Sequence, residues 1–301
     1  MFIEKEQYDK INRSFPLNAV ELLIFNSNDE VLMVKRTNEP AKGQWWIPGG
    51  RVLFVESRID AAKRLLKEEC GIITNNIHEI EMFEYSVRDN VDGHYQHTIS
   101  TVYKVVIPDS NIKIDSQSSE YAWKCPVEWV KLVEHDFLKQ LLNQESHSIS
   151  FMTKAVNRTE FISNELYSVI LKSLSIPCVD LVVKNKAGEI LLVNRKNEPA
   201  KDEWWVPGGR VLFGERREDA AKRKLLEECN LKANDFKKIG NFEFFFDVAG
   251  KKYHNIATLF EVTVDSSEVA LDEQSSDYKW LKPEEWLKYN LSDFIRKTLT
   301  N

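Results

Sequence analysis

The residues RTNEPAKGQWWIPGGRVLF at positions 36–54 return almost unchanged as RKNEPAKDEWWVPGGRVLF at positions 195–213. The same offset pairs Glu69 with Glu228, and all eight tryptophans of the chain fall at matched positions in the two copies. A period this long indicates a duplicated domain, because solenoid repeats run about 20–50 residues. The sequence therefore predicts two similar domains in tandem.

The segment between the two copies is polar and weakly patterned. We place the first domain at residues 1–143, a linker at 144–159 and the second domain at 160–301. A chain of 301 residues is long enough for two domains of ordinary size.

Each copy has the same order of expected elements. An N-terminal helix leads into an apolar hairpin, AVELLIF and EVLMVKR in the first copy, with a polar turn between the strands. The double glycine then precedes a strong helix, and two further strands lead to a final amphipathic helix. This order predicts the α/β class, with each domain an α/β/α sandwich around a mixed sheet.

Composition excludes several classes of protein. A net charge of −6 provides no basic field for binding DNA or RNA. No apolar run approaches the roughly 20 residues that span a bilayer, and the charged N-terminus does not resemble an export signal. The four cysteines form no CxxC pair, which argues against zinc and disulfides. We expect a cytoplasmic protein with no nucleic-acid or membrane partner.

The helix after the first double glycine, SRIDAAKRLLKEEC at 57–70, carries two adjacent carboxylates near its end. On a wheel of 100° per residue, Glu69 falls between Ala62 and Leu65, at the edge of the apolar face. A carboxylate there needs a cation or a metal, because burying it alone is very costly. Glu68 and Glu69 offer the hard oxygen ligands that Mg²⁺ prefers.

Two further features suit a phosphate ligand. Glycines let the backbone approach a ligand closely and leave a carbonyl free for metal. They are Gly49 and Gly50, with Gly208 and Gly209 in the second copy. Arginines suit phosphate oxygens. They are Arg36, Arg51 and Arg64, with Arg195, Arg210 and Arg223 in the second copy. Taken singly, Arg64–Glu68 also fits an ordinary surface pair and the glycines an ordinary turn, but the whole set occurs twice.

This spacing resembles the Nudix box, GX5EX7REUXEEXGU. The residues that carry the resemblance are Gly50, Glu56, Arg64, Glu68, Glu69 and Gly71, and in the second copy Gly209, Glu215, Arg223, Glu227 and Glu228. Leu65 and Lys224 stand where the box has its first Glu after the arginine, and Asn230 replaces the final glycine.

The flanking residues are similar to the GDP-mannose mannosyl hydrolase family within the Nudix superfamily. This resemblance implies magnesium, or manganese, as the cofactor and a nucleoside diphosphate sugar as the ligand. It implies that the metal is held by the Gly49 carbonyl, Glu69 and Gln117, and by the Gly208 carbonyl, Glu228 and Gln274. The six arginines are then expected to bind the diphosphate, and Glu21 and Asp180 to lie near the sugar.

Members of that family are homodimers in which N-terminal aromatics stack on the guanine. The matching residues are Phe2, Tyr8, Phe161 and Tyr167, although aromatics at a helix start are usually part of a core. The resemblance implies that the two domains pair as an intramolecular pseudo-dimer.

The general base that the family uses is absent. The family's histidine position is Ser118 in one copy and Ser275 in the other, and a serine cannot take a proton from water near pH 7. His97 and His254, the histidines matched between the copies, are one alternative. A remaining glutamate, Glu68 or Glu227, is another.

The sequence therefore predicts a Mg²⁺-dependent hydrolase of GDP-mannose or a related nucleotide sugar that releases nucleoside diphosphate and sugar. Two alternatives stay open: a pyrophosphatase that attacks phosphorus, and a module that binds the nucleotide sugar without cleaving it. In the second copy, Lys224 lies one helical turn before Glu228, where it can neutralise that carboxylate in place of a metal.

Overall fold

The computed structural model describes residues 3–89, 91–108, 111–143, 150–151 and 162–300. Internal contacts divide the chain into two compact units, Met1–Ser175 and Ile176–Asn301. Phe2 and Phe161, expected near the guanine, lie outside the described residues.

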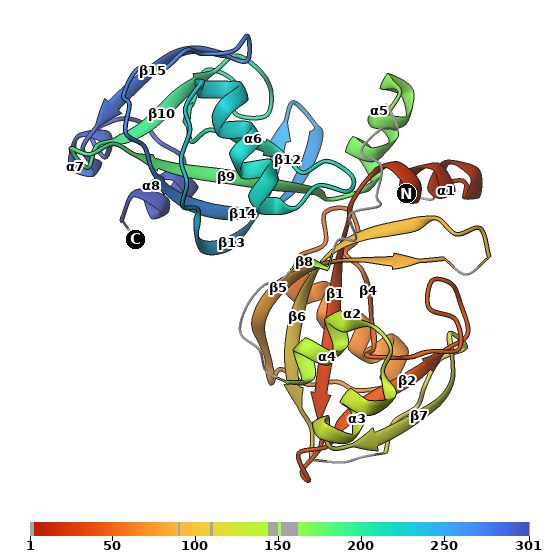
Figure 1. The fold of residues 1–301 in the computed structure, drawn as a ribbon. Helices are drawn as coiled ribbons and strands as arrows, with labels where there is room; N and C mark the ends of the chain where they lie inside the picture. The colour runs from red at the N-terminus through yellow and green to blue at the C-terminus, as the bar shows by residue number, and fades with distance from the viewer. Residues whose placement is uncertain (1–2, 90, 109–110, 144–149, 152–161, 301) are drawn as a thin grey trace. The chain divides into compact units, whose positions relative to one another are not determined.

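The first unit is built on one mixed sheet of eight strands (Figure 1). The strands are β1 (Leu17–Phe25), β2 (Val31–Arg36), β3 (Trp45–Trp46), β4 (Gly49–Arg51), β5 (Ile77–Arg88), β6 (Tyr95–Val106), β7 (Ser118–Lys124) and β8 (Ser150–Phe151). The central strands β1 and β6 run parallel, whereas β2, β4 and β5 pair antiparallel with their neighbours. This mixture of directions agrees with the sequence prediction.

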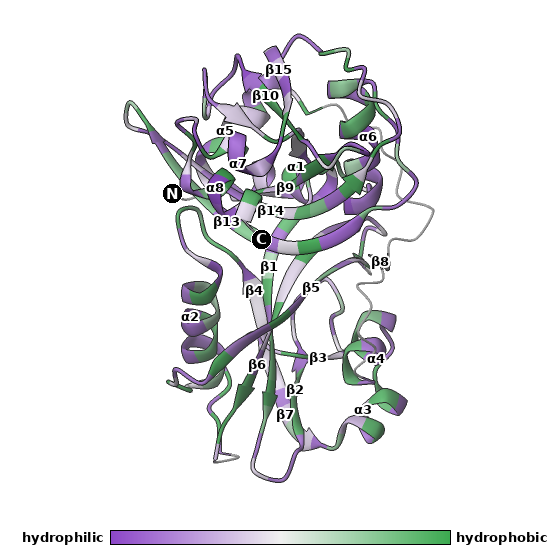
Figure 2. Ribbon diagram, turned by 90° about the vertical axis from the view of Figure 1, so that its left-hand side faces the viewer, coloured by the Kyte–Doolittle hydropathy of each residue, from purple (hydrophilic) through white to green (hydrophobic). Residues whose placement is uncertain are grey.

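Helices cover both faces of this sheet. The helices of this unit are α1 (Lys5–Ser14), α2 (Arg58–Cys70), α3 (Pro126–Leu132), α4 (Asp136–Leu142) and α5 (Asn164–Ser173). Helix α2 lies on one side of the strands, and α3 and α4 lie on the other (Figure 2). The core on the α3–α4 side gathers around the fully buried Trp129 and Phe137. The predicted α/β/α sandwich is therefore confirmed.

The second unit has the same architecture. Its strands are β9 (Ile176–Lys184), β10 (Ile190–Arg195), β11 (Trp204–Trp205), β12 (Gly208–Arg210), β13 (Lys237–Val248), β14 (Lys251–Thr263) and β15 (Ser275–Leu281), and its helices are α6 (Arg217–Cys229), α7 (Pro283–Trp286) and α8 (Asp293–Thr300). Its sheet has the order β11-β10-β9-β14-β13, with β12 on β9 and β15 on β10. Trp286 fills the core position that Trp129 fills in the first unit.

Helix α5 belongs to the first unit, although the sequence pattern assigns it to the second copy. The side-chain amide of Asn18 donates to the Ser175 carbonyl at 3.2 Å, and Leu53 forms an isolated bridge with Leu174. These bonds join the end of α5 to β1 and to the loop after β4. The boundary by contacts therefore falls after residue 175, later than the linker at 144–159 that the sequence suggests.

Both box helices end at residues that local chemistry favours, and α2 also begins at one. The Ser57 hydroxyl caps α2 by accepting from the Asp60 amide. Gly71 and Asn230 end α2 and α6 with φ of 68° and 55°, the left-handed conformation that these two residue types adopt most readily. The ends of both helices, which carry the paired glutamates, are thereby fixed. Within the described part of the chain, no helix is long and apolar enough to cross a membrane.

Trp286 and Trp280, near the end of the second unit, allow a matched test of how much a buried hydrogen bond contributes to the free energy of unfolding. The indole N–H of Trp286 donates to the Ile190 carbonyl at 2.9 Å in the core, and that of Trp280 donates to the Ser267 carbonyl at 3.0 Å near the surface. We expect Trp286→Phe to lower the free energy of unfolding by about 1–3 kcal/mol, because a buried carbonyl loses its donor.

Trp280→Phe is the control, with an expected loss below about 1 kcal/mol, since water replaces the lost donor. Urea unfolding of both variants measures the difference. Equal losses would contradict the assignment of Trp286 to the core.

Candidate active site

A cavity of about 750 Å³ opens in the first unit between α1, the ends of β1 and β6, the glycine strand β4 and the box helix α2. It gathers most of the first-domain residues that the sequence singles out. Its lining includes Tyr8, Glu21, Arg36, Gly49, Gly50, Arg51, Arg64, Glu68, Glu69 and Gln117. Residues spread over more than a hundred positions thus meet at one site.

The glycine pair is required by close packing. Strand β4 pairs with β1 so that Gly49 lies opposite Glu21 and Gly50 opposite Val20. A Cβ at Gly49 would lie 2.4 Å from the Val20 carbonyl oxygen and 2.5 Å from a carboxylate oxygen of Glu21. In the second unit, a Cβ at Gly208 would lie 2.4 Å from a carboxylate oxygen of Asp180. Only glycine fits there, and the backbone therefore approaches the buried acidic residue directly.

Glu69 is fastened to this strand. The Gly49 amide donates to Glu69 Oε2 at 3.0 Å, and the Gly208 amide donates to Glu228 Oε2 at 3.1 Å. Burial raises the pKa of Glu69 to about 7, with Asp115 contributing in the same direction and the Gly49 amide and the charge of Arg36 opposing it. Glu69 forms no ion pair with any lysine or arginine that the structure describes. A buried carboxylate of this kind is stabilised by an added cation.

The donor set around Glu69 fits Mg²⁺ bound together with a phosphate ligand. Among the described residues no group of three or more histidine, cysteine, aspartate and glutamate side chains is arranged to hold a metal. Mg²⁺ does not need such a cage, because it keeps several waters and binds one or two carboxylates plus substrate phosphates. Glu69, Gly49 and Gln117, the residues expected to hold the metal, all line the cavity and carry oxygen atoms of this type.

Arg64 is engaged by the protein itself. Its Nε and Nη2 donate to the two oxygens of Glu56 at 2.7 and 2.8 Å, and its Nη1 donates to Glu68 at 3.1 Å. Nη2 also donates to the Arg51 carbonyl at 3.0 Å, which ties the box helix to the loop after β4. The same bonds recur in the second unit between Arg223 and Glu215, Glu227 and Arg210. This network holds the loop in place, and a phosphate contact from either arginine stays a prediction.

Arg36 and Arg51 are the cavity arginines with more freedom to meet a ligand. Arg36 Nε donates to the Pro40 carbonyl at 2.8 Å, while its terminal nitrogens bond to no other described residue. Arg195 makes the matching bond to Pro199 at 3.1 Å. The Arg51 guanidinium lies 4.3 Å from the centre of the Tyr8 ring, a cation–π arrangement. Arg51 and Tyr8 thus present a cation and an aromatic ring together in the lining of the cavity.

The structure does not bring His97 to this cavity. Its neighbours on β6, Gln96 and Thr98, line the cavity, and successive strand residues face opposite sides of a sheet. His97 is 1% exposed and faces away. His254 Nε2 hydrogen-bonds Glu243 at 3.0 Å within its own sheet. Both histidines belong to the interior, which is the physical reason against the general-base alternative.

The sequence did not point to three residues: Asp115, its counterpart Asp272 in the second unit, and Tyr85. Asp115 accepts from the Gln117 amide N–H and side chain, both at 3.0 Å, and Asp272 holds Gln274 in the same way. The repeated Asp-x-Gln spacing is the signal that would have found them. Tyr85 donates its hydroxyl to Glu21 Oε1 at 2.6 Å. No repeat marks Tyr85, because the matching position in the second copy is a phenylalanine.

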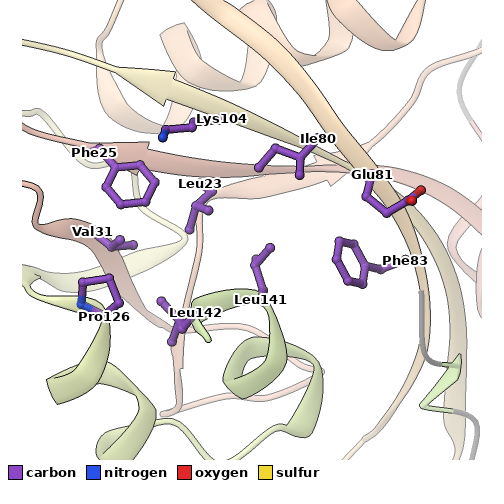
Figure 3. Close-up of a pocket in the computed structure, with 10 residues that line it drawn as sticks. All are labelled: Leu23, Phe25, Val31, Ile80, Glu81, Phe83, Lys104, Pro126, Leu141 and Leu142. Carbon is purple, nitrogen blue, oxygen red and sulfur yellow. The ribbon is translucent and has the colours of Figure 1, made fainter. Parts of the chain in front are cut away.

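A second cavity, of about 320 Å³, has a different chemistry (Figure 3). It lies between the sheet and α4, and apolar side chains such as Phe83 and Leu141 form most of its wall. Lys104 stands at its edge with Nζ 4.8 Å from the Phe25 ring. Its lining has neither the glycine pair nor an arginine, so it is unrelated to the carboxylate site.

A mixed-sheet sandwich with a box helix and a glycine pair at one end of its sheet defines a class of domain. The family model of the NUDIX domain matches residues 16–150 and again residues 175–301. The chain therefore belongs to the Nudix family and carries two such domains in tandem.

Two related proteins each match a length of this chain that is about one domain. The low-salt glycan biosynthesis protein Agl8 of Haloferax volcanii is 36% identical over 129 residues, 42% of this chain and 82% of the relative. The nucleoside triphosphatase NudI of Escherichia fergusonii is 33% identical over 106 residues, 33% of this chain and 74% of the relative.

Solved structures of the family are also similar. A MutT protein from Methanosarcina mazei Go1 is 25% identical with a TM-score of 0.36, covering 42% of this chain and 91% of its own. The NUDIX domain of Shewanella oneidensis NrtR, solved with ADP ribose, is 21% identical with a TM-score of 0.37, covering 48% of this chain and 97% of its own.

Glu21 makes stability depend on pH. Burial raises its pKa to about 8, although the Tyr85 hydroxyl and Arg36 act in the opposite direction. The folded protein therefore keeps a proton that the unfolded chain releases above about pH 4.5. The contribution of the protonated carboxyl is complete below pH 4.5 and is lost as the pH rises towards 8.

We expect Glu21→Gln to reduce the fall in unfolding free energy between pH 5 and pH 9 by about 2–4 kcal/mol, since one pKa unit corresponds to about 1.4 kcal/mol. Urea unfolding at the two pH values measures this. Glu120→Gln, which alters an exposed carboxylate on β7, is the control and should keep the native difference. An unaltered pH dependence in Glu21→Gln would argue against a protonated Glu21.

Proposed function

We propose that the first domain is a magnesium-dependent hydrolase of a nucleoside diphosphate sugar, GDP-mannose or a close relative, which releases the nucleoside diphosphate and the sugar. The observation that carries the proposal is the meeting of Glu69, the glycine pair, Arg36 and Arg51 in one cavity. A buried carboxylate that forms no ion pair with a described residue suits a divalent ion, and two nearby arginines suit phosphate oxygens.

The names of the relatives support the ligand class without fixing it. Agl8 is named for glycan biosynthesis, and NudI is named as a nucleoside triphosphatase. The first name concerns sugars and the second concerns a nucleotide with linked phosphates. The flanking residues shared with the mannosyl hydrolases favour the sugar nucleotide of the two.

Mg²⁺, when bound, would neutralise phosphate charge and make the diphosphate a better leaving group. Glu69, Gln117 and the Gly49 carbonyl would hold the ion, and Asp115 keeps Gln117 in position through its two hydrogen bonds. Arg36 and Arg51 would bind the remaining phosphate oxygens. Tyr8, already stacked on the Arg51 guanidinium, offers a flat apolar face for a base.

Glu21 is proposed to contact the sugar. With a pKa of about 8 its carboxyl keeps a proton at neutral pH and is a hydrogen-bond donor. Glu21 lines the cavity, Tyr85 donates to its Oε1, and its Oε2 is buried beside Gly49 without a hydrogen-bond partner. The second domain has Asp180 at this position, a shorter acid whose pKa burial raises to about 7.

Glu68 is the proposed acceptor of the proton from the attacking water. It lines the cavity, its side chain is 58% exposed, and the Arg64 Nη1 bond at 3.1 Å fixes its direction. Glu227 holds the same position in the second domain, where it pairs with Arg223. The pairing of the two domains as an intramolecular pseudo-dimer stays a prediction, as does the role of Tyr167 in it.

An NMR time course on GDP-mannose with Mg²⁺ tests the reaction. The expected products are GDP and free mannose, and the first anomer formed reports attack at carbon. GMP with mannose 1-phosphate would assign the protein to the pyrophosphatases. No turnover across a panel of nucleotide sugars, with binding seen by calorimetry, would establish the non-catalytic alternative.

The two box carboxylates are expected to contribute unequally. We expect Glu69→Gln to lower kcat/KM by on the order of 100-fold or more, because the lost metal contact removes several kcal/mol of charge stabilisation. Glu228→Gln is expected to cost less than about tenfold, since Lys224 already occupies that carboxylate.

Steady-state hydrolysis with Mg²⁺ measures both variants, and Glu120→Gln serves as the unaltered control. Similar partial losses from the two substitutions would show that both domains turn over substrate.

A further inference from the structure

Leu65 and Lys224 occupy the same place in the two domains. Each follows the box arginine on its helix and lies against the second glycine of the pair. A Cβ on Gly50 would lie 2.9 Å from Leu65 Cδ2, and a Cβ on Gly209 would lie 2.7 Å from Lys224 Cε. The stem of Lys224 therefore fills the space that an apolar side chain fills in the first domain.

The ammonium group of Lys224 lies among the box carboxylates. Its Nζ is 3.2 Å from Glu228 Oε1 and 3.4 Å from Glu227 Oε2. The Lys224 side chain is 12% exposed and the Glu228 side chain 10% exposed, so this is a nearly buried pair. Since the Gly208 amide holds Oε2 of Glu228 at 3.1 Å, both oxygens of this carboxylate are occupied.

The first domain has no such cation. Leu65 is apolar, and Glu69 has the Gly49 amide as a partner but no ion pair with a described residue. Removing one partner of a buried ion pair is strongly unfavourable, because the other charge is left uncompensated. A divalent ion at Glu228 would have to displace Lys224 or lie beside its positive charge. The residues of the second domain therefore do not fit the metal that suits the first.

We propose that the second domain is a metal-independent binding site for a diphosphate group, in which the Lys224 ammonium stands in the place of the divalent cation. Arg195 supplies further positive charge, with its Nε held by the Pro199 carbonyl. The ligand class, a nucleoside diphosphate or its sugar ester, rests on the proposed function. The expected number of metal ions bound per chain does not depend on the proposed function.

Exchanging the side chains of Leu65 and Lys224 tests how many metal ions the chain binds. The full-length chain is titrated with Mn²⁺ alone, and free Mn²⁺ is followed by electron paramagnetic resonance. The native chain is expected to bind one ion. Lys224→Leu is expected to bind two, Leu65→Lys none, and the double exchange one.

Lys224→Met guards against a packing effect, because it keeps the length of the stem against Gly209 and removes only the charge. It is also expected to bind two ions. Lys222→Met is the matched control on the same helix, since Lys222 pairs with the exposed Glu218 at 2.6 Å, and it should bind one ion. Two ions on the native chain, or one ion on both Lys224 variants, would overturn the proposal.

The binding of GDP in the presence of EDTA tests the anion. Calorimetry on the native chain is expected to show one GDP per chain without metal. Lys224→Met is expected to weaken that binding at least tenfold, and Lys222→Met to leave it unchanged.

The two measurements separate two kinds of failure. GDP binding that disappears with EDTA would overturn the anion site while the Mn²⁺ count stands. No GDP binding with or without Mg²⁺ would instead refute the proposed function in both domains.

Discussion

The hydrogen bond from the Gly49 amide to the Glu69 carboxylate is the constraint around which the first site is arranged. It joins the end of the box helix to the glycine strand and leaves a negative charge in a largely buried place. The strand in turn lies so close to Glu21 that only glycine fits. Two acidic groups are therefore held near one another, and burial raises the pKa of Glu69 to about 7 and that of Glu21 to about 8. The ionised form of a carboxylate in such a place is stabilised by positive charge nearby.

The surroundings of this carboxylate differ between the two domains, which keep the same frame. The network of Arg64 with Glu56 and Glu68 is repeated bond for bond by Arg223 with Glu215 and Glu227. The glycine-to-carboxylate bond is also repeated. The two domains differ at one side chain on the box helix, which is Leu65 or Lys224. They also differ at the residue opposite the first glycine, which is Glu21 or Asp180. The duplication thus preserves the scaffold and varies the chemistry placed on it.

The fold and most of the site could be predicted because the signals are local and occur twice. The box spacing places Glu69 and the glycine pair together, and Gly71 and Asn230 end their helices as their residue types require. Other features depend on contacts that no local pattern records. Tyr85 reaches Glu21 across the sheet, and α5 bonds through Ser175 to the first unit.

The direction of the His97 side chain is not recorded by the sequence, which left His97 open as one alternative for the general base. Strand alternation sets it, and it follows once the cavity side of β6 is known. The sequence repeat made His97 prominent because both copies keep a histidine there. A residue type that both copies share can serve a contact in the interior of the domain as well as a step of the reaction.

The space beside the second glycine has a consequence for how such proteins change over time. Gly50 and Gly209 each leave room for a neighbour on the helix, and that room accepts a leucine or the stem of a lysine with the same backbone. A single replacement there alters the local charge without disturbing the packing that holds the helix to the strand. In a duplicated chain, one such substitution is therefore enough to give the two copies different charges at the same place on an otherwise unchanged frame.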